Sequence, residues 1–169
     1  IWPRPYGSGS IRIYEYSTAS DSWSLMGPEI YGEAASDQFG TSVSISNDGH
    51  TVAVGAPKND GNGEDAGHVR VYKYNPSTST WNQLDGDIDG TESRNLGSSV
   101  SISGDGLTLA VTAPVKSSSG PLVEIFRYDA SNNTWQTFGA PLDIPGTFHN
   151  RFIADISLND DGSRIVIGD

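Results

Sequence analysis

A repeated unit of about 55 residues constrains the fold of this chain more than any other feature, because a period of this size identifies a repeat architecture. The segment FGTSVSISNDGHTVAVGAP begins at Phe39, and related segments begin at Leu96 and Phe152, so that the starts lie 57 and 56 residues apart. Each segment has two short runs of alternating apolar and polar residues around a polar turn, as in a β-hairpin. The chain is therefore a repeat protein, and its fold has to be read from one unit.

Two further landmarks recur in the same order. The first is an alternating strand followed by a polar turn and a tryptophan, which is Trp23, Trp81 or Trp135. The second is an isoleucine two residues before a glycine, seen at Ile30/Gly32, Ile88/Gly90 and Ile144/Gly146. Three landmarks in one order indicate that the whole unit, and not one motif, is repeated.

The strand before each tryptophan carries apolar or aromatic groups on both faces. In the copy before Trp81, Val69 and Val71 point to one face, and Tyr72 and Tyr74 point to the other, because side chains alternate along a strand. A strand that is apolar on both sides fits a sheet packed between neighbouring sheets. Since no stretch shows a sustained 3.6-residue period, we predict no helix.

These units predict an all-β fold of β-propeller blades, each with four antiparallel strands. About three blades' worth of sequence is present, and the predicted parts are the second half of a blade, two whole blades and the first half of a blade, at residues 1–37, 38–93, 94–150 and 151–169. Three blades are too few to close a ring, which usually has about four to eight. Either the two halves complete a shared blade or the chain is a slice of a longer array. We favour a slice, or a chain that completes its ring with another copy.

Composition excludes several classes of function. The net charge is −11, the pI is near 4.4 and the ten Lys and Arg residues are scattered, so binding to a nucleic-acid backbone is not expected. No apolar run approaches the ~20 residues of a membrane-spanning helix. The absence of cysteine excludes disulfides and thiolate metal sites. An acidic, Gly- and Ser-rich surface suits an extracellular or cell-surface protein, and Ile1 in place of Met indicates a processed product or part of something longer.

Phe39-Gly40, followed by Gly55-Ala56-Pro57, resembles the FG-GAP repeat, which is the blade unit of the integrin α-subunit propeller and of many secreted microbial and algal proteins. The wider text is similar to FG-GAP-like arrays in surface proteins of marine microbes and stramenopile algae, and this resemblance covers nearly the whole chain. The copies at Leu96-Gly97 and Phe152-Ile153 depart from the full motif. The family's calcium loop, DxDxDGxxD, is replaced here by the short SNDGHT, so we do not carry that calcium site over.

A different loop is the candidate calcium site. Asp60, Asn62, Glu64 and Asp65 place oxygen side chains among glycines, as loops that wrap a hard cation do. A solvated turn explains the same composition, and the matching loop of the next copy, KSSSG, has no acid. The segment from Asp85 to Gly90 looks like the opening of an EF-hand, but the other copies keep only its Ile and Gly, which indicates a core contact and a turn.

Three groups of residues have competing interpretations. The repeated tryptophans, Trp23 among them, could form a platform for sugar rings, but their fixed place in each unit favours packing. His50, His68 and His149 sit at unrelated offsets and accompany no nucleophile motif, so we expect ordinary surface or packing histidines. Asn132 lies in an N-x-T sequon at a predicted hairpin tip and is either a glycosylation site or a chance match.

We therefore expect an extracellular or cell-surface propeller module, calcium-stabilised, that acts in adhesion, matrix or filament assembly through protein or glycan partners. We expect no catalytic residue, no organic cofactor and no enzymatic activity. Two alternatives stay open, namely a carbohydrate-binding propeller and a propeller enzyme whose active site needs further blades. Fold alone does not decide among them.

Overall fold

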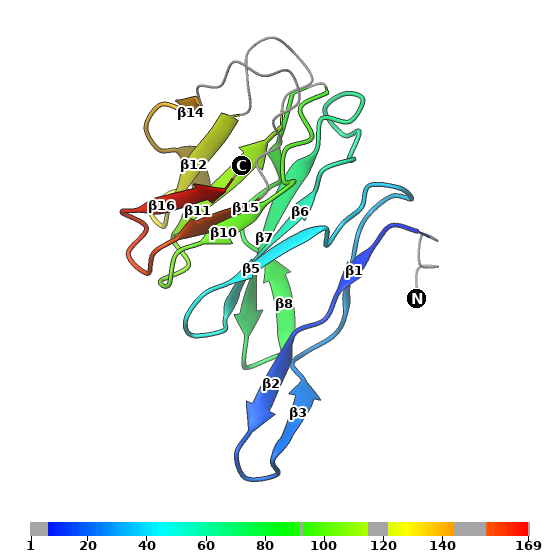
Figure 1. Cartoon of the computed structure of the whole chain (residues 1–169). Coiled ribbons are helices and arrows are strands. Elements are labelled where there is room, and N and C mark those ends of the chain that lie inside the picture. The colour runs from blue at the N-terminus through cyan, green and yellow to red at the C-terminus, as the bar shows by residue number, and fades with distance from the viewer. Residues whose placement is uncertain (1–6, 92, 115–121, 144–154, 169) are drawn as a thin grey trace.

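The computed structural model describes residues 7–91, 93–114, 122–143 and 155–168, and all its regular elements there are β-strands (Figure 1). The prediction of an all-β fold without helices is confirmed for these residues. No helix that could cross a membrane occurs among them. The strands are β1 (Ser10–Ile11), β2 (Tyr14–Ser17), β3 (Ser22–Leu25), β4 (Ile30–Tyr31), β5 (Ser42–Ile45), β6 (Thr51–Ala56), β7 (His68–Asn75), β8 (Thr80–Gln83), β9 (Ile88–Asp89), β10 (Val100–Ile102), β11 (Thr108–Ala113), β12 (Leu122–Asp129), β13 (Thr134–Thr137), β14 (Leu142–Asp143), β15 (Asp155–Leu158) and β16 (Ile165–Gly168).

Two sheets are four-stranded antiparallel meanders, β5-β6-β7-β8 and β10-β11-β12-β13. Four strand positions per unit follow from them. β5, β10 and β15 hold the first position, β6, β11 and β16 the second, β7 and β12 the third, and β8 and β13 the fourth. A short fifth strand, β9 or β14, also pairs with the third-position strand, which the sequence did not predict. Leu142 pairs with Val123 as Ile88 pairs with Val69, and Ile144 of the predicted landmark lies outside the described residues.

The first unit holds the third position as two separate strands, β1 and β2, where the sequence predicts one. β4 pairs with β1, and β3 pairs with β2, which leaves Arg12 and Ile13 between the two ladders. In β7 the equivalent residues, Arg70 and Val71, are held in a ladder only by the second-position strand β6. The division of the strand thus reflects the lack of a second-position strand beside it among the described residues.

Gly55 of the FG-GAP motif, and Gly67 directly before β7, lie where neighbouring sheets touch through their backbones. A Cβ on Gly55 would overlap the carbonyl oxygen of Gly97 in the next unit, and one on Gly67 would overlap that of Leu96. Gly67 and Leu96 also form a parallel bridge, as Gly9 and Phe39 do one unit earlier. The motif is therefore a contact between units, and glycine is required because a side chain there has no room.

Apolar side chains fill the space on both sides of the central sheet, as predicted. Val69 and Val71 belong to a cluster shared with β10 and β11, whereas Tyr72 belongs to one shared with Ile11 and Ile13. The turns joining first- and second-position strands close with the same hydrogen bonds: the Asp48 carboxylate accepts from the Ser46 hydroxyl at 2.6 Å and from the His50 amide at 2.9 Å. Asp105 and Asp161 repeat this pattern. The carboxylates of these aspartates therefore stabilise the turns.

Each tryptophan at the start of a fourth-position strand packs on the tyrosine opposite, with ring centroids 5.1 to 5.4 Å apart. The indole of Trp81 also donates a 2.7 Å hydrogen bond to the carbonyl oxygen of Met26 in the preceding unit, and Trp135 donates likewise to Leu84. The tryptophans thus join one unit to the one before it. Where the units divide stays a prediction, since the boundary at 150–151 lies outside the described residues.

Candidate functional site

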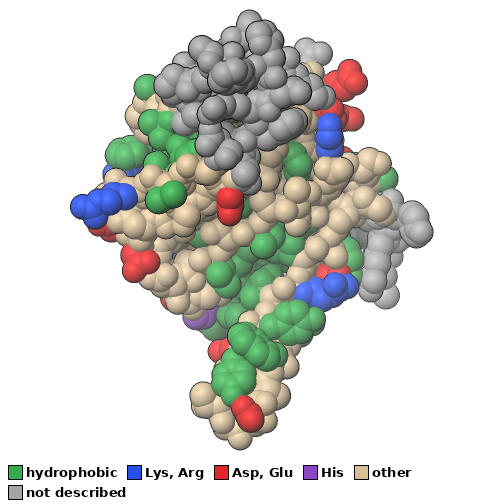
Figure 2. All heavy atoms as spheres, in the orientation of Figure 1, with side chains coloured by type: hydrophobic (Ala, Val, Ile, Leu, Met, Phe, Trp, Pro, Cys, Tyr) green, Lys and Arg blue, Asp and Glu red, His purple; other side chains and the backbone are tan. Residues whose placement is uncertain are grey.

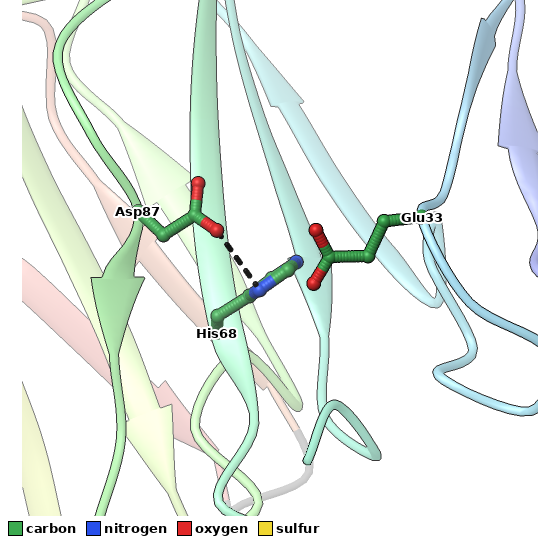
Figure 3. A group of neighbouring side chains, drawn as sticks. All are labelled: Glu33, His68 and Asp87. Atoms are coloured by element: carbon green, nitrogen blue, oxygen red, sulfur yellow. Dashed lines mark ion pairs between the residues drawn. The ribbon is translucent and has the colours of Figure 1, made fainter. Parts of the chain in front are cut away.

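Three segments bring four charged or polar side chains together, which we call the polar cluster: Glu33, His68, Arg70 and Asp87 (Figure 3). His68 and Arg70 are two residues apart on β7 and therefore share one face of the strand. Asp87 directly precedes β9, which pairs with the start of β7. Glu33 follows β4, so the cluster joins the first unit to the second.

Arg70 connects the two carboxylates of the polar cluster. Its guanidinium binds Asp87 through two hydrogen bonds of 2.7 Å and also contacts Glu33. Glu33 accepts a second hydrogen bond of 2.7 Å from the side chain of Asn59. A fork of this kind fixes orientation as well as charge, because the planar guanidinium matches the planar carboxylate.

His68 is the buried member of the cluster, with 1% of its surface exposed. Its Nδ1 has no hydrogen-bond partner and lies 3.5 Å from the Oδ2 of Asp87. Burial, and after it the charge of Arg70, lowers the pKa of His68, so the imidazole is neutral near pH 7. Figure 3 shows its ring lying between Asp87 and Glu33.

The carboxylates are held ionised. Hydrogen bonds from Arg70 lower the pKa of Asp87 against the opposing effect of burial. For Glu33, burial acts to raise the pKa, but hydrogen bonds from Arg70 and Asn59 outweigh it and the pKa is lowered. The contacts with both carboxylates raise the pKa of Arg70. The polar cluster is thus two carboxylates, one guanidinium and a neutral imidazole, with one negative charge in excess.

Glu33, His68 and Asp87 each offer one ligand atom, and these atoms lie within 4.8 Å of one another. One imidazole nitrogen with two carboxylate oxygens is a donor set that suits zinc and related cations. Arg70 already places a positive charge between the two carboxylates, however. The arrangement therefore acts primarily as an ion-pair network that holds Glu33 against β7 and the segment before β9.

Replacing Arg70 with alanine should destabilise the protein, because the largely buried guanidinium is lost and the carboxylates of Glu33 and Asp87 lose their shared partner. Both carboxylates are solvent-screened, so we expect the free energy of unfolding to fall by about 1–2 kcal/mol. Arg12 is the matched control, since it occupies the same place in the first unit and pairs with Glu29 at 2.5 Å, but with half of its side chain exposed. Arg12→Ala should cost less than about 1 kcal/mol. Urea denaturation measures the stability of both variants, and equal losses would contradict the stabilising role of the Arg70 ion pairs.

The structure places the four predicted calcium ligands in one loop between β6 and β7, without gathering their side chains around one point. The amine of Lys58 binds the Asp65 carboxylate at 2.6 Å, and Asp60 accepts a hydrogen bond from the Asp65 amide. The amide of Asn62 donates to the carbonyl oxygen of Gly90, and Glu64 is exposed. Calcium binding at this loop stays a prediction.

The other candidate residues lie in turns or contact neighbouring side chains. In the EF-hand-like segment, Asp85 accepts a hydrogen bond from the Trp135 amide, while Asp87 binds Arg70. Asn132 is exposed in the turn between β12 and β13, and glycosylation there stays a prediction. His50 packs on Tyr74, and His149 lies outside the described residues.

Sequence reasoning missed the polar cluster. It treated His68 as an ordinary packing histidine and did not consider Glu33 or Arg70. One signal was present: His68 and Arg70 face one side of a strand whose other side, Val69 and Val71, is apolar, so two polar groups had to be buried or paired. The partner Glu33 could not be found, because it depends on how two units pack.

Comparison with protein families matches residues 32–72 to the FG-GAP repeat. This range contains Glu33, His68 and Arg70, together with the glycine-rich loop of the calcium prediction. No curated protein matches the chain.

Two solved structures share the fold. One is a candidate 6-phosphogluconolactonase from Bacteroides fragilis, with a TM-score of 0.53 and 15% identity over 82% of this chain and 34% of that chain. The other is the periplasmic gluconolactonase of Pseudomonas aeruginosa, with a TM-score of 0.55 and 16% identity over 92% of this chain and 42% of that chain. This chain thus spans less than half the length of either structure.

The expectation that the chain is not an enzyme needs correction. It rested on the lack of a catalytic motif in the sequence, and both structural neighbours are named as lactonases. At this level of identity the likeness shows the fold alone, so the fold gives no ground for excluding enzymatic activity. The fold prediction is confirmed, and the chain is a β-propeller module that carries an FG-GAP repeat at residues 32–72.

Proposed function

We propose that this chain is an extracellular or cell-surface propeller module that acts in adhesion, matrix or filament assembly through contacts with protein partners. One observation carries the proposal: a groove of about 400 Å³ opens between the β1–β2 segment and β5. Its walls are mostly apolar and include Ile13, Tyr14, Val43 and Ile45. Open apolar surface of this kind marks interaction sites in soluble proteins.

The surroundings of the groove support a protein partner. The β2–β3 hairpin projects from the body of the molecule (Figure 1), and Figure 2 shows apolar side chains along it. Tyr14, Tyr16, Trp23 and Leu25 on this hairpin are all exposed. The acidic composition, with a net charge of −11, supports an extracellular setting, where self-repulsion keeps such a protein soluble.

A binding assay on intact cells of the organism that produces this protein tests this function. The labelled chain should bind the cell surface, and treating the cells with a protease beforehand should abolish the binding. Ile45→Asp places a charge in the groove at an exposed position and should weaken binding, whereas Thr78→Asp, in the exposed turn between β7 and β8, should not. Equal binding to untreated and protease-treated cells would overturn the proposal.

We further propose that calcium stabilises the module at the loop of Asp60, Asn62, Glu64 and Asp65. Calcium at a concentration 100 times its Kd should raise the free energy of unfolding by about 2.7 kcal/mol. The ion has to displace Lys58 from Asp65, so Lys58→Ala should strengthen its binding. Melting curves with calcium and with EDTA measure the effect, with Asp60→Asn as control. Coincident curves would refute the calcium site.

A second candidate function follows from the structural neighbours, which are named as lactonases. On this view the module contributes blades to a ring whose centre hydrolyses a sugar lactone. Incubation with glucono-lactone and measurement of acid release tests this activity. Hydrolysis no faster than in buffer would contradict a lactonase activity of this chain.

A further inference from the structure

One nitrogen of the polar cluster is buried without a partner, and it lies beside a carboxylate. The imidazole of His68 is 1% exposed, and its Nδ1 has no hydrogen-bond partner among the described residues. A buried polar group without a partner costs free energy, so its presence in a fold needs an explanation. Figure 3 shows Nδ1 turned towards Asp87, with Glu33 on the other side of the ring. The unpartnered nitrogen is therefore directed into the polar cluster.

The distance between His68 and Asp87 suits two ligands of one metal ion. Nδ1 of His68 lies 3.5 Å from Oδ2 of Asp87, which is long for a hydrogen bond. In a tetrahedral zinc site, ligand atoms about 2.1 Å from the ion lie about 3.4 Å from one another. In the part of the chain that the structure describes, Oδ2 accepts a hydrogen bond from Arg70 alone. A carboxylate oxygen has two lone pairs, so the second one is free to bind a cation.

Glu33 supplies a third ligand. One of its oxygens lies within 4.8 Å of the ligand atoms of both His68 and Asp87. The side chain of Glu33 is 44% exposed and that of Asp87 is 25% exposed, so Glu33 is the freer of the two to move. A shift of up to about 1.4 Å brings its oxygen to the spacing of a tetrahedral site. The hydrogen bond from Asn59 to Glu33 is of the kind that orients carboxylate ligands on metals.

The charge around His68 matches a divalent cation. Asp89 lies opposite His68 in the β7–β9 ladder, so the two side chains share a face of the sheet, and Asp87 shares it two residues earlier. Burial, and after it the charge of Asp87, raises the pKa of Asp89. With Glu33 and Arg70 included, the ionised groups carry two negative charges in excess. A divalent cation neutralises that excess.

We propose that Nδ1 of His68, Oδ2 of Asp87 and a carboxylate oxygen of Glu33 bind one zinc ion, with water as the fourth ligand. One imidazole with two carboxylates is a donor set for zinc and related transition metals, whereas calcium takes oxygen ligands. Both carboxylates reach solvent, which gives the ion a path to the buried imidazole. Arg70 keeps its hydrogen bond to Oδ1 of Asp87 and so orients that carboxylate.

The zinc ion joins the first unit to the second, because Glu33 comes from one and His68 from the other. The site is independent of the proposed function, since none of its ligands lines the groove or belongs to the loop of the calcium proposal. The first unit contains a matched ion pair without the imidazole. Arg12 pairs there with Glu29, but Ser10 stands at the place of His68. We therefore expect no zinc site at that pair.

Isothermal titration calorimetry of the chain with zinc chloride tests the site. We expect saturable binding, and Glu33→Gln should raise the Kd at least about tenfold, because even the loss of a residue that only orients a ligand costs about 10–100-fold. The exposure of Glu33 means that this variant should fold, which circular dichroism checks. Glu29→Gln is the matched control and should leave the Kd unchanged. A chain that binds no zinc, or equal Kd values for the two variants, would overturn the proposal.

Nitrogen NMR of the imidazole rings tests direct ligation. Zinc should shift the Nδ1 resonance of His68. His50 is the internal control: its Nδ1 lies 3.7 Å from Asp48, but it is exposed and belongs to no group of three possible ligands among the described residues. His50→Gln should therefore leave the Kd for zinc unchanged. A His68 resonance that does not move at saturating zinc would show that the ion binds elsewhere and that the assignment is wrong.

The zinc site and the calcium proposal fail separately. Asp60→Asn should leave the Kd for zinc unchanged, and excess calcium should not displace zinc from the imidazole nitrogen. Zinc should raise the melting temperature of the unmodified chain more than that of Glu33→Gln, because an ion that binds only the folded state stabilises it. Loss of zinc binding in Asp60→Asn with full binding in Glu33→Gln would place the ion in the glycine-rich loop and overturn the site at His68.

Discussion

Gly67→Ala should destabilise the protein strongly. Gly67 has a φ of +72°, where a Cβ costs about 1–2 kcal/mol. The same Cβ would overlap the backbone of Leu96 in the next unit, and overpacking against a fixed backbone adds about 1–3 kcal/mol. We therefore expect a loss of about 3–4 kcal/mol, which lowers the melting temperature by roughly 10 °C.

Gly49 provides the matched control. Its φ is +70°, almost that of Gly67, but a Cβ there meets no atom within 4 Å. Gly49→Ala should therefore show only the conformational cost, about 1–2 kcal/mol. Thermal and urea denaturation of the two variants isolates the effect of contact between units. Equal losses would mean that the units are not in backbone contact between Gly67 and Leu96.

The FG-GAP motif shows why the fold could be predicted from the sequence. The alternating strands, the Asn47–Gly49 turn and the recurring glycines are all local signals. Each recurs in the other copies, so the three copies support the same strand assignment. The short strands β9 and β14 were missed because two residues carry no periodicity. In the third copy Leu142 takes the ladder position, two residues before Ile144, which lies outside the described residues.

The polar cluster could not be predicted, since it depends on packing between units. Glu33 and Arg70 are 37 residues apart and meet only because the first unit packs against the second. The repeats support only part of the cluster: Arg12 and Glu29 stand at the places of Arg70 and Asp87 in the first unit and also form an ion pair. Ser10 and Leu122 stand at the place of His68, so comparison of the copies gave no signal for a buried histidine there.

Trp81→Ala should have an effect of similar size, for a different reason. Trp81 is 8% exposed, packs on Tyr74 and donates to the carbonyl oxygen of Met26 across the boundary between units. Truncation of a buried tryptophan to alanine costs about 3–5 kcal/mol. Trp23 holds the same repeat position but is 67% exposed, so Trp23→Ala should lower the free energy of unfolding by less than about 1 kcal/mol.

The pair also separates packing from sugar binding. If the tryptophans were a sugar platform, both variants would lose glycan binding, and neither would need to lose stability. Urea denaturation measures the stability of both variants and a glycan array measures their binding. A loss of glycan binding in both variants, with no loss of stability for Trp81→Ala, would contradict the packing role.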